Sequence, residues 1–323
     1  MICIESAIAA PIEYRFRSFR KLKAGGHQFI SSASIATRHR GISEPLAHNN
    51  QYLAWCPKLL GHSDGEDVLG VSRWFLPMKI SVCMATYQGA DYVERQLRSI
   101  LEQLGPDDEV IVVDDCSRDR TVEVIEAIGD ARIAVHRNPV NRREVYSFGR
   151  AIELAKGDII FMADQDDVWV PGRAELMSGR LLASGAALVS TNFEWTDADE
   201  RPIDVAFDGV SAQASNLHLG NILDIFVGKT NYFGCAMAFQ RSLVPLITPI
   251  PAYVESHDLW IALAANQIGS NLHLDDRTLL KRRHGSNTTS TKSKRPLFQK
   301  LWSRWVFLRS MQELAARRRR LSS

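Results

Sequence analysis

The sequence predicts an α/β fold with a doubly wound, mostly parallel β-sheet and helices on both faces. From residue 79 onward, short runs of β-branched residues alternate with amphipathic stretches of helical period. This alternation is typical of a sheet whose strands are covered on both sides. Acidic residues come directly after two of the runs, at the strand ends where parallel sheets bind their ligands.

The order of elements follows from periodicity and from turn residues. In the stretch 91–104, Val93, Leu97 and Leu101 share one helical face, and Gly105 with Pro106 ends the helix. Regularity fades into a polar insertion after about Thr196, then returns in the segments 222–226 and 234–239 and in a helix at 259–267. The expected strands are 80–86, 109–115, 132–136, 158–163 and 186–193, and the helices between them are 91–104, 119–128, 145–156 and 171–183.

The chain divides into three parts. Residues 1–77 lack sustained periodicity, so we expect a poorly ordered extension there. Because the organised pattern starts at Met78, we hypothesise that Met78 is the genuine start of the protein. The α/β domain is expected at 78–290, and a basic amphipathic helix at 291–323.

The C-terminal helix has two open interpretations. Its aromatic and aliphatic residues recur near helical spacing and are interleaved with basic residues that end in the arginine run 317–320. Such a helix can rest on the anionic inner face of the cytoplasmic membrane, or it can pack its apolar face onto the domain. The apolar residues concerned are Phe298, Leu301, Trp302, Trp305, Phe307, Leu308 and Met311.

Composition excludes several classes of protein. The formal net charge is +2, which gives little support to nucleic-acid binding. The five cysteines are scattered and form no C-x-x-C pair, so neither a disulfide framework nor a zinc site is indicated. No apolar run reaches the roughly 18 residues that a spanning helix needs. A cytoplasmic protein is therefore expected.

The acidic residues after the strands predict a cation site. Asp114 and Asp115 end the second expected strand, and the Asp164-Gln165-Asp166-Asp167 string ends the fourth. Carboxylates from separate strands in one crevice repel one another unless a cation neutralises them. Oxygen ligands favour Mg²⁺ or Mn²⁺, and these ions leave coordination positions for diphosphate oxygens.

Three motifs in register carry a resemblance to a known family. The segments 84–89 (MATYQG), 112–117 (VVDDCS) and 163–169 (ADQDDVW) follow the first, second and fourth expected strands. Together they closely resemble glycosyltransferase family 2. The later segments 233–239 (FGCAMAF), 257–260 (HDLW) and 283–287 (RHGSN) are similar to its rhamnosyltransferase-like bacterial members. The resemblance spans about residues 78–287.

The resemblance implies a GT-A fold, with a nucleotide-binding half and an acceptor-binding half, and a role for each matching position. Thr86 and Tyr87 would line the nucleotide pocket, and Asp115 or its neighbour Asp114 would contact the base and ribose. Asp164 would approach the ribose or a Mn²⁺ or Mg²⁺ ion. The direct metal ligand would be Asp166, with His284 as a further candidate.

The acceptor side follows in the same way. Asp258 would be the general base that deprotonates the acceptor hydroxyl, although an Asp at this place can also cap the helix. Gly234 permits a close approach of the backbone, and Cys235 is expected to be a packing residue. The pocket for sugar and acceptor is assigned to Asp167, Trp169, Gly234, His257 and Trp260.

The implied reaction is an inverting transfer of a sugar from a nucleotide donor to a glycan or lipid-linked glycan, as in the synthesis of O-antigen and other surface polysaccharides. The resemblance favours dTDP-rhamnose as donor, followed by UDP-sugars. One rival is a sugar nucleotidyltransferase, but no basic residue occurs between Met84 and Arg95 to hold a triphosphate. The other rival is a nucleotide-sugar-binding subunit without turnover.

Overall fold

The computed structural model describes residues 13–15, 36–38, 78–205, 209–229, 232–283 and 296–323. The chain forms two compact units, Met1–Val71 and Ser72–Ser323. In the first unit, β1 (Glu13–Arg15) pairs antiparallel with β2 (Ala36–Arg38). The remainder of the expected extension 1–77 lies outside the described residues.

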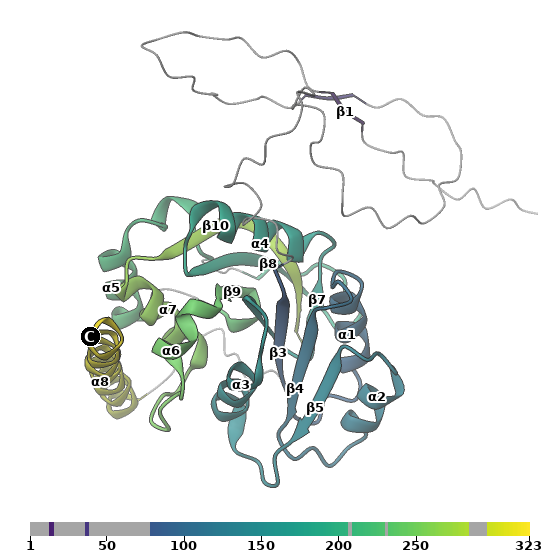
Figure 1. The fold of residues 1–323 in the computed structure, drawn as a ribbon, viewed down its shortest axis with the longest axis horizontal. Coiled ribbons are helices and arrows are strands. Elements are labelled where there is room, and N and C mark those ends of the chain that lie inside the picture. Colours follow the sequence, from purple (N-terminus) through teal and green to yellow (C-terminus); the bar gives the residue numbers. More distant parts are fainter. Residues whose placement is uncertain (1–12, 16–35, 39–77, 206–208, 230–231, 284–295) are drawn as a thin grey trace, which may run out of the picture. The chain divides into compact units, whose positions relative to one another are not determined.

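The second unit is built on a mixed sheet of eight strands among the described residues, in the order β5-β4-β3-β6-β9-β8-β10-β7 (Figure 1). Six of these strands run in the same direction, which confirms the mostly parallel sheet. Their bounds are β3 (Ile80–Thr86), β4 (Glu109–Asp114), β5 (Ile133–Arg137), β6 (Ile159–Ala163), β7 (Val168–Trp169), β8 (Leu188–Thr196), β9 (Met237–Gln240) and β10 (Asn271–Arg282).

Helices connect the strands and cover the sheet (Figure 1). None of the helices in the described part of the chain has the length and apolar composition needed to cross a bilayer. Their bounds are α1 (Val93–Leu101), α2 (Thr121–Ala127), α3 (Arg143–Leu154), α4 (Arg173–Ser184), α5 (His218–Val227), α6 (Val244–Ile247), α7 (His257–Gln267) and α8 (Leu297–Ser322), with short 3₁₀ turns at Ala212–Ala214, Gly234–Ala236 and Arg241–Leu243.

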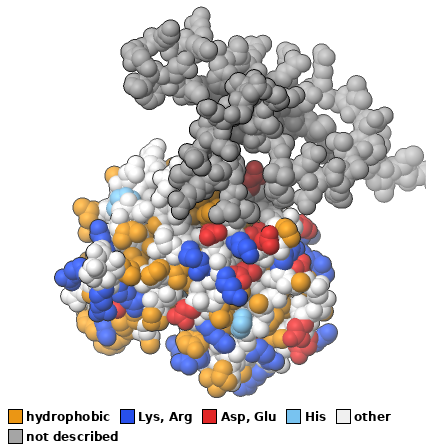
Figure 2. Space-filling model, viewed as in Figure 1, with side chains coloured by type: hydrophobic (Ala, Val, Ile, Leu, Met, Phe, Trp, Pro, Cys, Tyr) orange, Lys and Arg blue, Asp and Glu red, His pale blue; other side chains and the backbone are white. Residues whose placement is uncertain are grey.

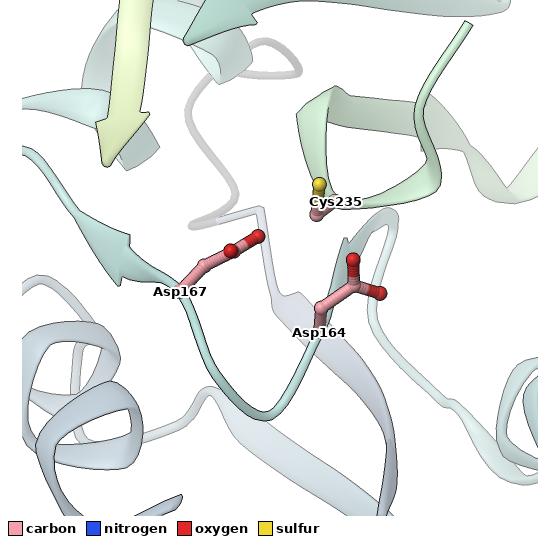
Figure 3. Close-up of side chains that lie close together, drawn as sticks. All are labelled: Asp164, Asp167 and Cys235. Carbon is pink, nitrogen blue, oxygen red and sulfur yellow. The ribbon is translucent and has the colours of Figure 1, made fainter. Parts of the chain in front are cut away.

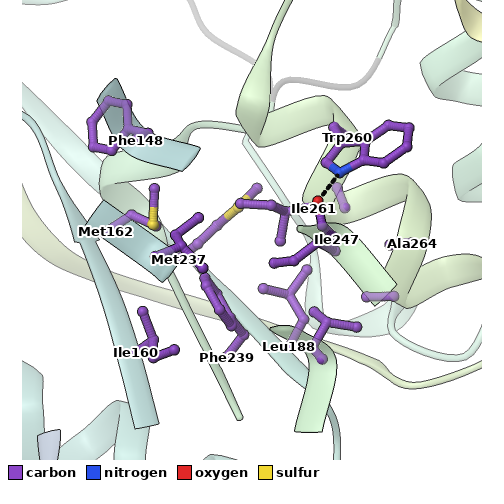
Figure 4. Packing of buried hydrophobic residues seen from close by; sticks show 14 of the residues in the cluster. Phe148, Ile160, Met162, Leu188, Met237, Phe239, Ile247, Trp260, Ile261 and Ala264 are labelled. Carbon is purple, nitrogen blue, oxygen red and sulfur yellow. Dashed lines mark hydrogen bonds between the residues drawn. The ribbon is translucent and has the colours of Figure 1, made fainter. Parts of the chain in front are cut away.

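Each face of the sheet has its own hydrophobic core, because successive side chains of a strand point to opposite faces. Val82 and Met84 of β3 belong to the cluster that α1, α2 and α4 cover. Cys83 belongs to the other cluster, which α3, α6 and α7 cover. Figure 4 shows part of this second core, where β6, β8 and β9 meet α3, α6 and α7. Helices therefore cover both faces, as predicted.

The structure adds detail to the sequence prediction in three places. Strand β9 runs antiparallel to both β6 and β8, and β7 runs antiparallel to β10, so these two strands are the exceptions in the mostly parallel sheet. The segment 222–226 lies inside helix α5. Strand β10 was not expected at all, because its centre carries Asp275, Asp276 and Arg277, which are exposed there.

Candidate functional site

Loops that follow parallel strands meet at one edge of the sheet. Strand β3 ends at Thr86, β4 at Asp114, β6 at Ala163 and β10 at Arg282. Because these strands share a direction, the chain leaves each of them at the same edge. Residues in strained backbone conformations cluster at functional sites. Positive φ angles occur at Gln88 (50°), Cys116 (65°) and Glu200 (63°) in the loops after β3, β4 and β8, and at Arg143 (69°), the first residue of α3.

Gln165 fastens the loop after β3 to the loop after β6. The Tyr87 amide donates to Gln165 Oε1 at 2.9 Å, and Gln165 Nε2 donates to the Tyr87 carbonyl at 3.1 Å. Gly89 makes this approach feasible, since a Cβ at that position would lie 2.3 Å from Gln165 Oε1. The middle residue of the Asp164-Gln165-Asp166 string therefore joins two loops that carry predicted nucleotide and metal contacts.

Asp114 is fully buried and ties the ends of neighbouring strands together. Its Oδ1 accepts from Thr86 Oγ1 at 3.1 Å and from Ser117 Oγ at 2.5 Å. Its Oδ2 accepts from the Ser117 amide at 3.0 Å and lies 3.7 Å from Arg137 Nε. Both carboxylate oxygens of Asp114 thus have internal partners, and these contacts hold the ends of β3, β4 and β5 together.

Asp115 fixes the loop that precedes helix α3. Its side chain is 3% exposed and accepts from Asn138 Nδ2 and the Arg142 amide, each at 2.8 Å. The Arg143 amide donates to the other oxygen at 2.7 Å. The two adjacent aspartates therefore both have structural partners, and which of them also contacts a nucleotide stays a prediction.

Glu144, the next residue after that loop, is a site carboxylate that the sequence analysis missed. It lies in the first turn of α3. Partial burial raises the pKa of Glu144, and the charges of Asp164 and Asp258 raise it further, against the lowering effect of His257 and Lys281. Glu144 therefore interacts electrostatically with charged residues of the predicted site.

A buried lysine lies between Asp164, which was expected to bind a metal, and Asp167, which was assigned to the sugar and acceptor pocket. Lys281 is 3% exposed, and its Nζ lies 3.0 Å from Asp164 Oδ2 and 3.5 Å from Asp167 Oδ2. The thiol of Cys235 lies 3.4 Å from the same nitrogen. Figure 3 shows Asp164 and Asp167 at the two ends of one loop, with Cys235 on a facing turn. We call these four residues the lysine cluster.

Charge and burial compete in the lysine cluster. Burial and the charges of Asp166 and Asp164 raise the pKa of Asp167 to about 7, although Lys281 lowers it. Burial also opposes ionisation of Asp164, but the Lys281 ammonium outweighs it and holds the pKa of Asp164 below its usual value. Burial would lower the pKa of Lys281, yet the carboxylates raise it well above normal. The cluster therefore holds a permanent cation.

A divalent ion fits the oxygen atoms here better than the sulfur atom. The ligand atoms of Asp164, Asp167 and Cys235 lie within 4.8 Å of one another. Mg²⁺ and Mn²⁺ prefer oxygen, and burial raises the pKa of the Cys235 thiol well above normal, so it stays protonated. Coordination of a metal by Asp164 and Asp166 stays a prediction. His284 lies outside the described residues.

His257 is buried beside Gly234 and keeps two unused ring nitrogens. The imidazole is 7% exposed and stacks on Phe148 with ring centroids 4.1 Å apart. Among the described residues, neither of its nitrogens has a hydrogen-bond partner. A Cβ at position 234 would lie 2.6 Å from Nε2, so only glycine fits there. Buried polar atoms without partners are rare, and a bound ligand would satisfy them.

Asp258 lies in the first turn of α7 but is not the residue that caps the helix. Ser256 is the N-cap, and its Oγ accepts from the Leu259 amide. Asp258 Oδ1 accepts from the same amide at 2.8 Å and from Ser256 Oγ. Burial raises the pKa of Asp258, and the charge of Asp164 adds to this, against the lowering effect of His257. A carboxyl group with a raised pKa is suited to accept a proton.

Three residues assigned to the sugar and acceptor pocket are buried among internal partners. Trp169 is 3% exposed and packs against Phe161 in the core beneath α1 and α4. Trp260 is 2% exposed, and its indole donates to the Ile247 carbonyl at 2.9 Å, as Figure 4 shows. Asp167 is 1% exposed and pairs with Lys281. Trp169 and Trp260 therefore contribute to the core, and the assignment of Asp167 to the pocket stays a prediction.

The end of β10 supplies the basic residues that the sequence analysis missed. Beside Lys281, Arg282 donates from its Nε to the Asp166 carbonyl at 3.1 Å and from Nη2 to Glu200 Oε1 at 3.2 Å. It thereby ties the polar insertion to the loop after β6. One signal could have revealed these residues, since Leu279-Leu280-Lys281-Arg282 directly precedes the 283–287 motif.

Curated proteins similar to this chain include several that make bacterial polysaccharides. The succinoglycan biosynthesis protein ExoO of Rhizobium meliloti is 30% identical over 165 residues, which are 50% of this chain and 47% of ExoO. The dTDP-rhamnosyl transferase RfbG of Shigella flexneri is 29% identical over 116 residues, or 34% of this chain and 40% of RfbG. The chain spans about half the length of the curated relatives it matches.

Solved structures share the fold at low sequence identity. S. aureus TarS in complex with UDP-GlcNAc has a TM-score of 0.55 and 18% identity, over 74% of this chain and 66% of that chain. The mannosyltransferase PcManGT of Pyrobaculum calidifontis, in complex with GDP-Man and Mn²⁺, has a TM-score of 0.50 and 16% identity, over 75% and 74%. The mixed, mostly parallel sheet has the GT-A fold.

A family model accounts for the region that carries the site. The model described as glycosyl transferase family 2 matches residues 81–244, just over half of the 323 residues. This region contains the loops after β3, β4 and β6 together with Gly234 and Cys235. The chain belongs to glycosyl transferase family 2.

Proposed function

We propose that the protein is an inverting glycosyltransferase of bacterial surface-polysaccharide synthesis, with its catalytic domain in residues 78–290. The observation that carries the proposal is the placement of Asp258. This carboxyl group lies at the start of α7, burial raises its pKa, and the charge of Asp164, the residue after β6, raises the pKa further. This electrostatic effect of Asp164 supports a site that combines a proton acceptor with the predicted donor-binding residues.

Asp258 would act as general base in a single displacement. Its carboxylate accepts the proton of an acceptor hydroxyl as the oxygen forms a bond to the anomeric carbon of the donor sugar. The bond between that carbon and the nucleoside diphosphate breaks in the same step, and the leaving group keeps the electron pair. Attack from the opposite side inverts the anomeric configuration, and no covalent enzyme intermediate is needed.

The nucleotide side of the site would hold the donor. Thr86, Tyr87 and one of the two adjacent aspartates would contact the nucleoside, and Asp164 would contact the ribose. Asp166 and Asp164 would hold Mn²⁺ or Mg²⁺, which neutralises charge on the diphosphate when it is bound. The unused nitrogens of His257 would hydrogen-bond the sugar or the acceptor. The Mn²⁺ in PcManGT, a protein of the same fold, supports the metal.

For the donor we propose dTDP-rhamnose, with UDP-sugars as the next candidates. The similarity to a dTDP-rhamnosyl transferase supports the first, and a complex of the TarS structure with UDP-GlcNAc supports the second. The acceptor would be a glycan or a lipid-linked glycan. The similarity to ExoO, a succinoglycan biosynthesis protein, and to RfbG, a dTDP-rhamnosyl transferase, supports this proposal.

The test compares Asp258→Asn with the unchanged protein. NMR of the sugar product would report the anomeric configuration relative to the donor, and equilibrium titration would report donor affinity. We expect inversion by the unchanged protein, and for the variant an unchanged donor affinity with turnover reduced by about 10²-fold or more. Retention of configuration, or a variant with full turnover, would remove Asp258 from the reaction.

A further inference from the structure

The C-terminal helix α8 presents an apolar face away from the domain. Its inner face is formed by Val306, Ser310 and Leu314, which are all buried. Residues at helical spacing on the opposite face remain in solvent. Their exposed fractions are 75% for Phe298, 60% for Leu301, 44% for Trp302, 45% for Trp305 and 54% for Leu308. The helix therefore packs onto the domain and leaves Phe298, Trp302 and Trp305 exposed.

Helix α5 extends this apolar face. Phe226 of α5 contacts Phe307 of α8, with ring centroids 5.2 Å apart. The outer side of α5 exposes Leu219 by 78% and Leu223 by 62%. An open groove of about 660 Å³ runs between the two helices, where Leu219 and Met311 are among the apolar lining residues. We call the exposed apolar residues of α5 and α8, together with this groove, the α5–α8 surface.

Basic side chains surround the α5–α8 surface. Arg318 and Arg319 line the groove. Arg309 lies over the rings of Tyr253 and Trp305, at 4.1 and 5.2 Å from the guanidinium carbon to each centroid. Figure 2 shows hydrophobic and basic side chains next to one another at the left edge of the molecule, where Figure 1 places α8. Exposed tryptophan, leucine and arginine together match the interface of an anionic bilayer.

We propose that the α5–α8 surface docks the protein on an anionic lipid bilayer. Contiguous apolar patches on soluble proteins mark interaction sites, and the basic rim selects a negatively charged partner. The helix lies on the bilayer and does not cross it. Tryptophan and leucine side chains enter the interfacial region, and the arginines contact lipid phosphates.

Hydrogen bonds connect α8 to α7 and to the residues just before it, near the proposed catalytic residue. Asp258 lies in the first turn of α7, and Gln267 is the last residue of this helix. Gln267 Nε2 donates to the Met311 carbonyl of α8 at 3.1 Å. Ser303 of α8 donates to Glu255, just before α7, at 3.1 Å. An 11-residue helix spans about 16 Å, so docking would hold the site within about that distance of α8.

Vesicle flotation of the full chain tests the proposal. We expect binding to vesicles of phosphatidylcholine with phosphatidylglycerol, weak binding to phosphatidylcholine alone, and weaker binding at high salt. The variant Trp302→Ser with Trp305→Ser should lower the partition coefficient by about tenfold or more. Arg319→Gln should lower it about fivefold.

Matched controls come from helix α4. Leu182 is exposed by 47%, and Arg180 is also exposed, so Leu182→Ser and Arg180→Gln should bind vesicles as the unchanged protein does. Circular dichroism and thermal unfolding of every variant verify folding, and sedimentation verifies the oligomeric state. Failure of the full chain to float, or equal flotation of the tryptophan and Leu182 variants, would overturn the proposal. A tryptophan variant that only dissociates a dimer would assign the surface to a second copy of the chain.

Discussion

Replacement of Lys281 by methionine tests the lysine cluster most directly. Methionine is similar in length but carries no charge, so the change leaves Asp167 buried without its cation. The Lys281 side chain is 4% exposed and that of Asp167 is 1% exposed, whereas Asp164 keeps 32% exposure. Removal of one partner from a buried ion pair costs about 3–5 kcal/mol. Because water reaches Asp164, we expect the lower end, about 3 kcal/mol.

The cost of this substitution should depend on pH. The pKa of Asp167 in the folded protein, about 7, is above its unfolded value, so ionisation of Asp167 opposes folding. Lys281 lowers the pKa of Asp167, so its removal raises that pKa further. Below about pH 7 Asp167 therefore carries a proton in the folded state of both proteins, and above it only the unchanged protein has an ionised Asp167 that Lys281 stabilises. The effect of Lys281→Met on the free energy of unfolding should therefore be largest at about pH 8 and smaller at about pH 6.

Urea unfolding in the presence of a chelator, followed by tryptophan fluorescence, measures the effect. Asp167→Asn is the matched partner, because it removes the charge with little change in shape. In a double-mutant cycle the two substitutions should couple by more than about 1 kcal/mol. Each substitution removes one partner of the Lys281–Asp167 pair, so the second substitution has no ion pair left to break. Additive effects within about 0.5 kcal/mol, or a loss that does not change with pH, would refute the buried ion pair.

Three further predictions follow from particular contacts. Gly157→Ala should lower the free energy of unfolding by about 2 kcal/mol or more, because the new Cβ would lie 2.5 Å from the Ser81 backbone nitrogen. Gly179→Ala, in open space on α4, should raise the free energy of unfolding by about 0.5–1 kcal/mol. Urea unfolding compares the two variants. The pH profile of kcat should rise through the raised pKa of Asp258, so its acidic limb should lie above the ordinary range of an aspartate, and a midpoint near 4 would contradict this. Lys281→Met should raise the Mn²⁺ affinity measured by electron paramagnetic resonance, because a competing cation leaves Asp164; an unchanged affinity would place the metal elsewhere.

Much of the fold could be predicted because apolar periodicity reflects burial. Strands β3, β4 and β6 are buried on both faces, so the β-branched runs at 80–86, 109–115 and 158–163 identify them to within one residue at each end. Strand β10 could not be predicted in this way. Its buried ends enclose an exposed charged centre, and register irregularities interrupt its pairing with β8.

The positions of some predicted site residues follow from the order of the strands. Thr86, Asp114 and Asp164 follow from the ends of three strands, so the motif order alone brings them together. Lys281 and Glu144 could not be found, because β10 was not expected and the raised pKa of Glu144 depends on distant carboxylates. Trp169 and Trp260 are buried in the core, and a sequence motif does not show whether an aromatic residue faces a ligand or the core.

Ligand binding to the purified full chain addresses the central claim. Saturation-transfer NMR against a panel of nucleotide sugars, with Mn²⁺ or Mg²⁺ and then with a chelator, would show which donor binds. We predict that one donor binds in a metal-dependent way, and dTDP-rhamnose is the first candidate. The Asp258→Asn variant should retain this binding, and the Asp166→Ala variant should lose it. Absence of binding to every donor in the panel would contradict the account of a donor-binding glycosyltransferase.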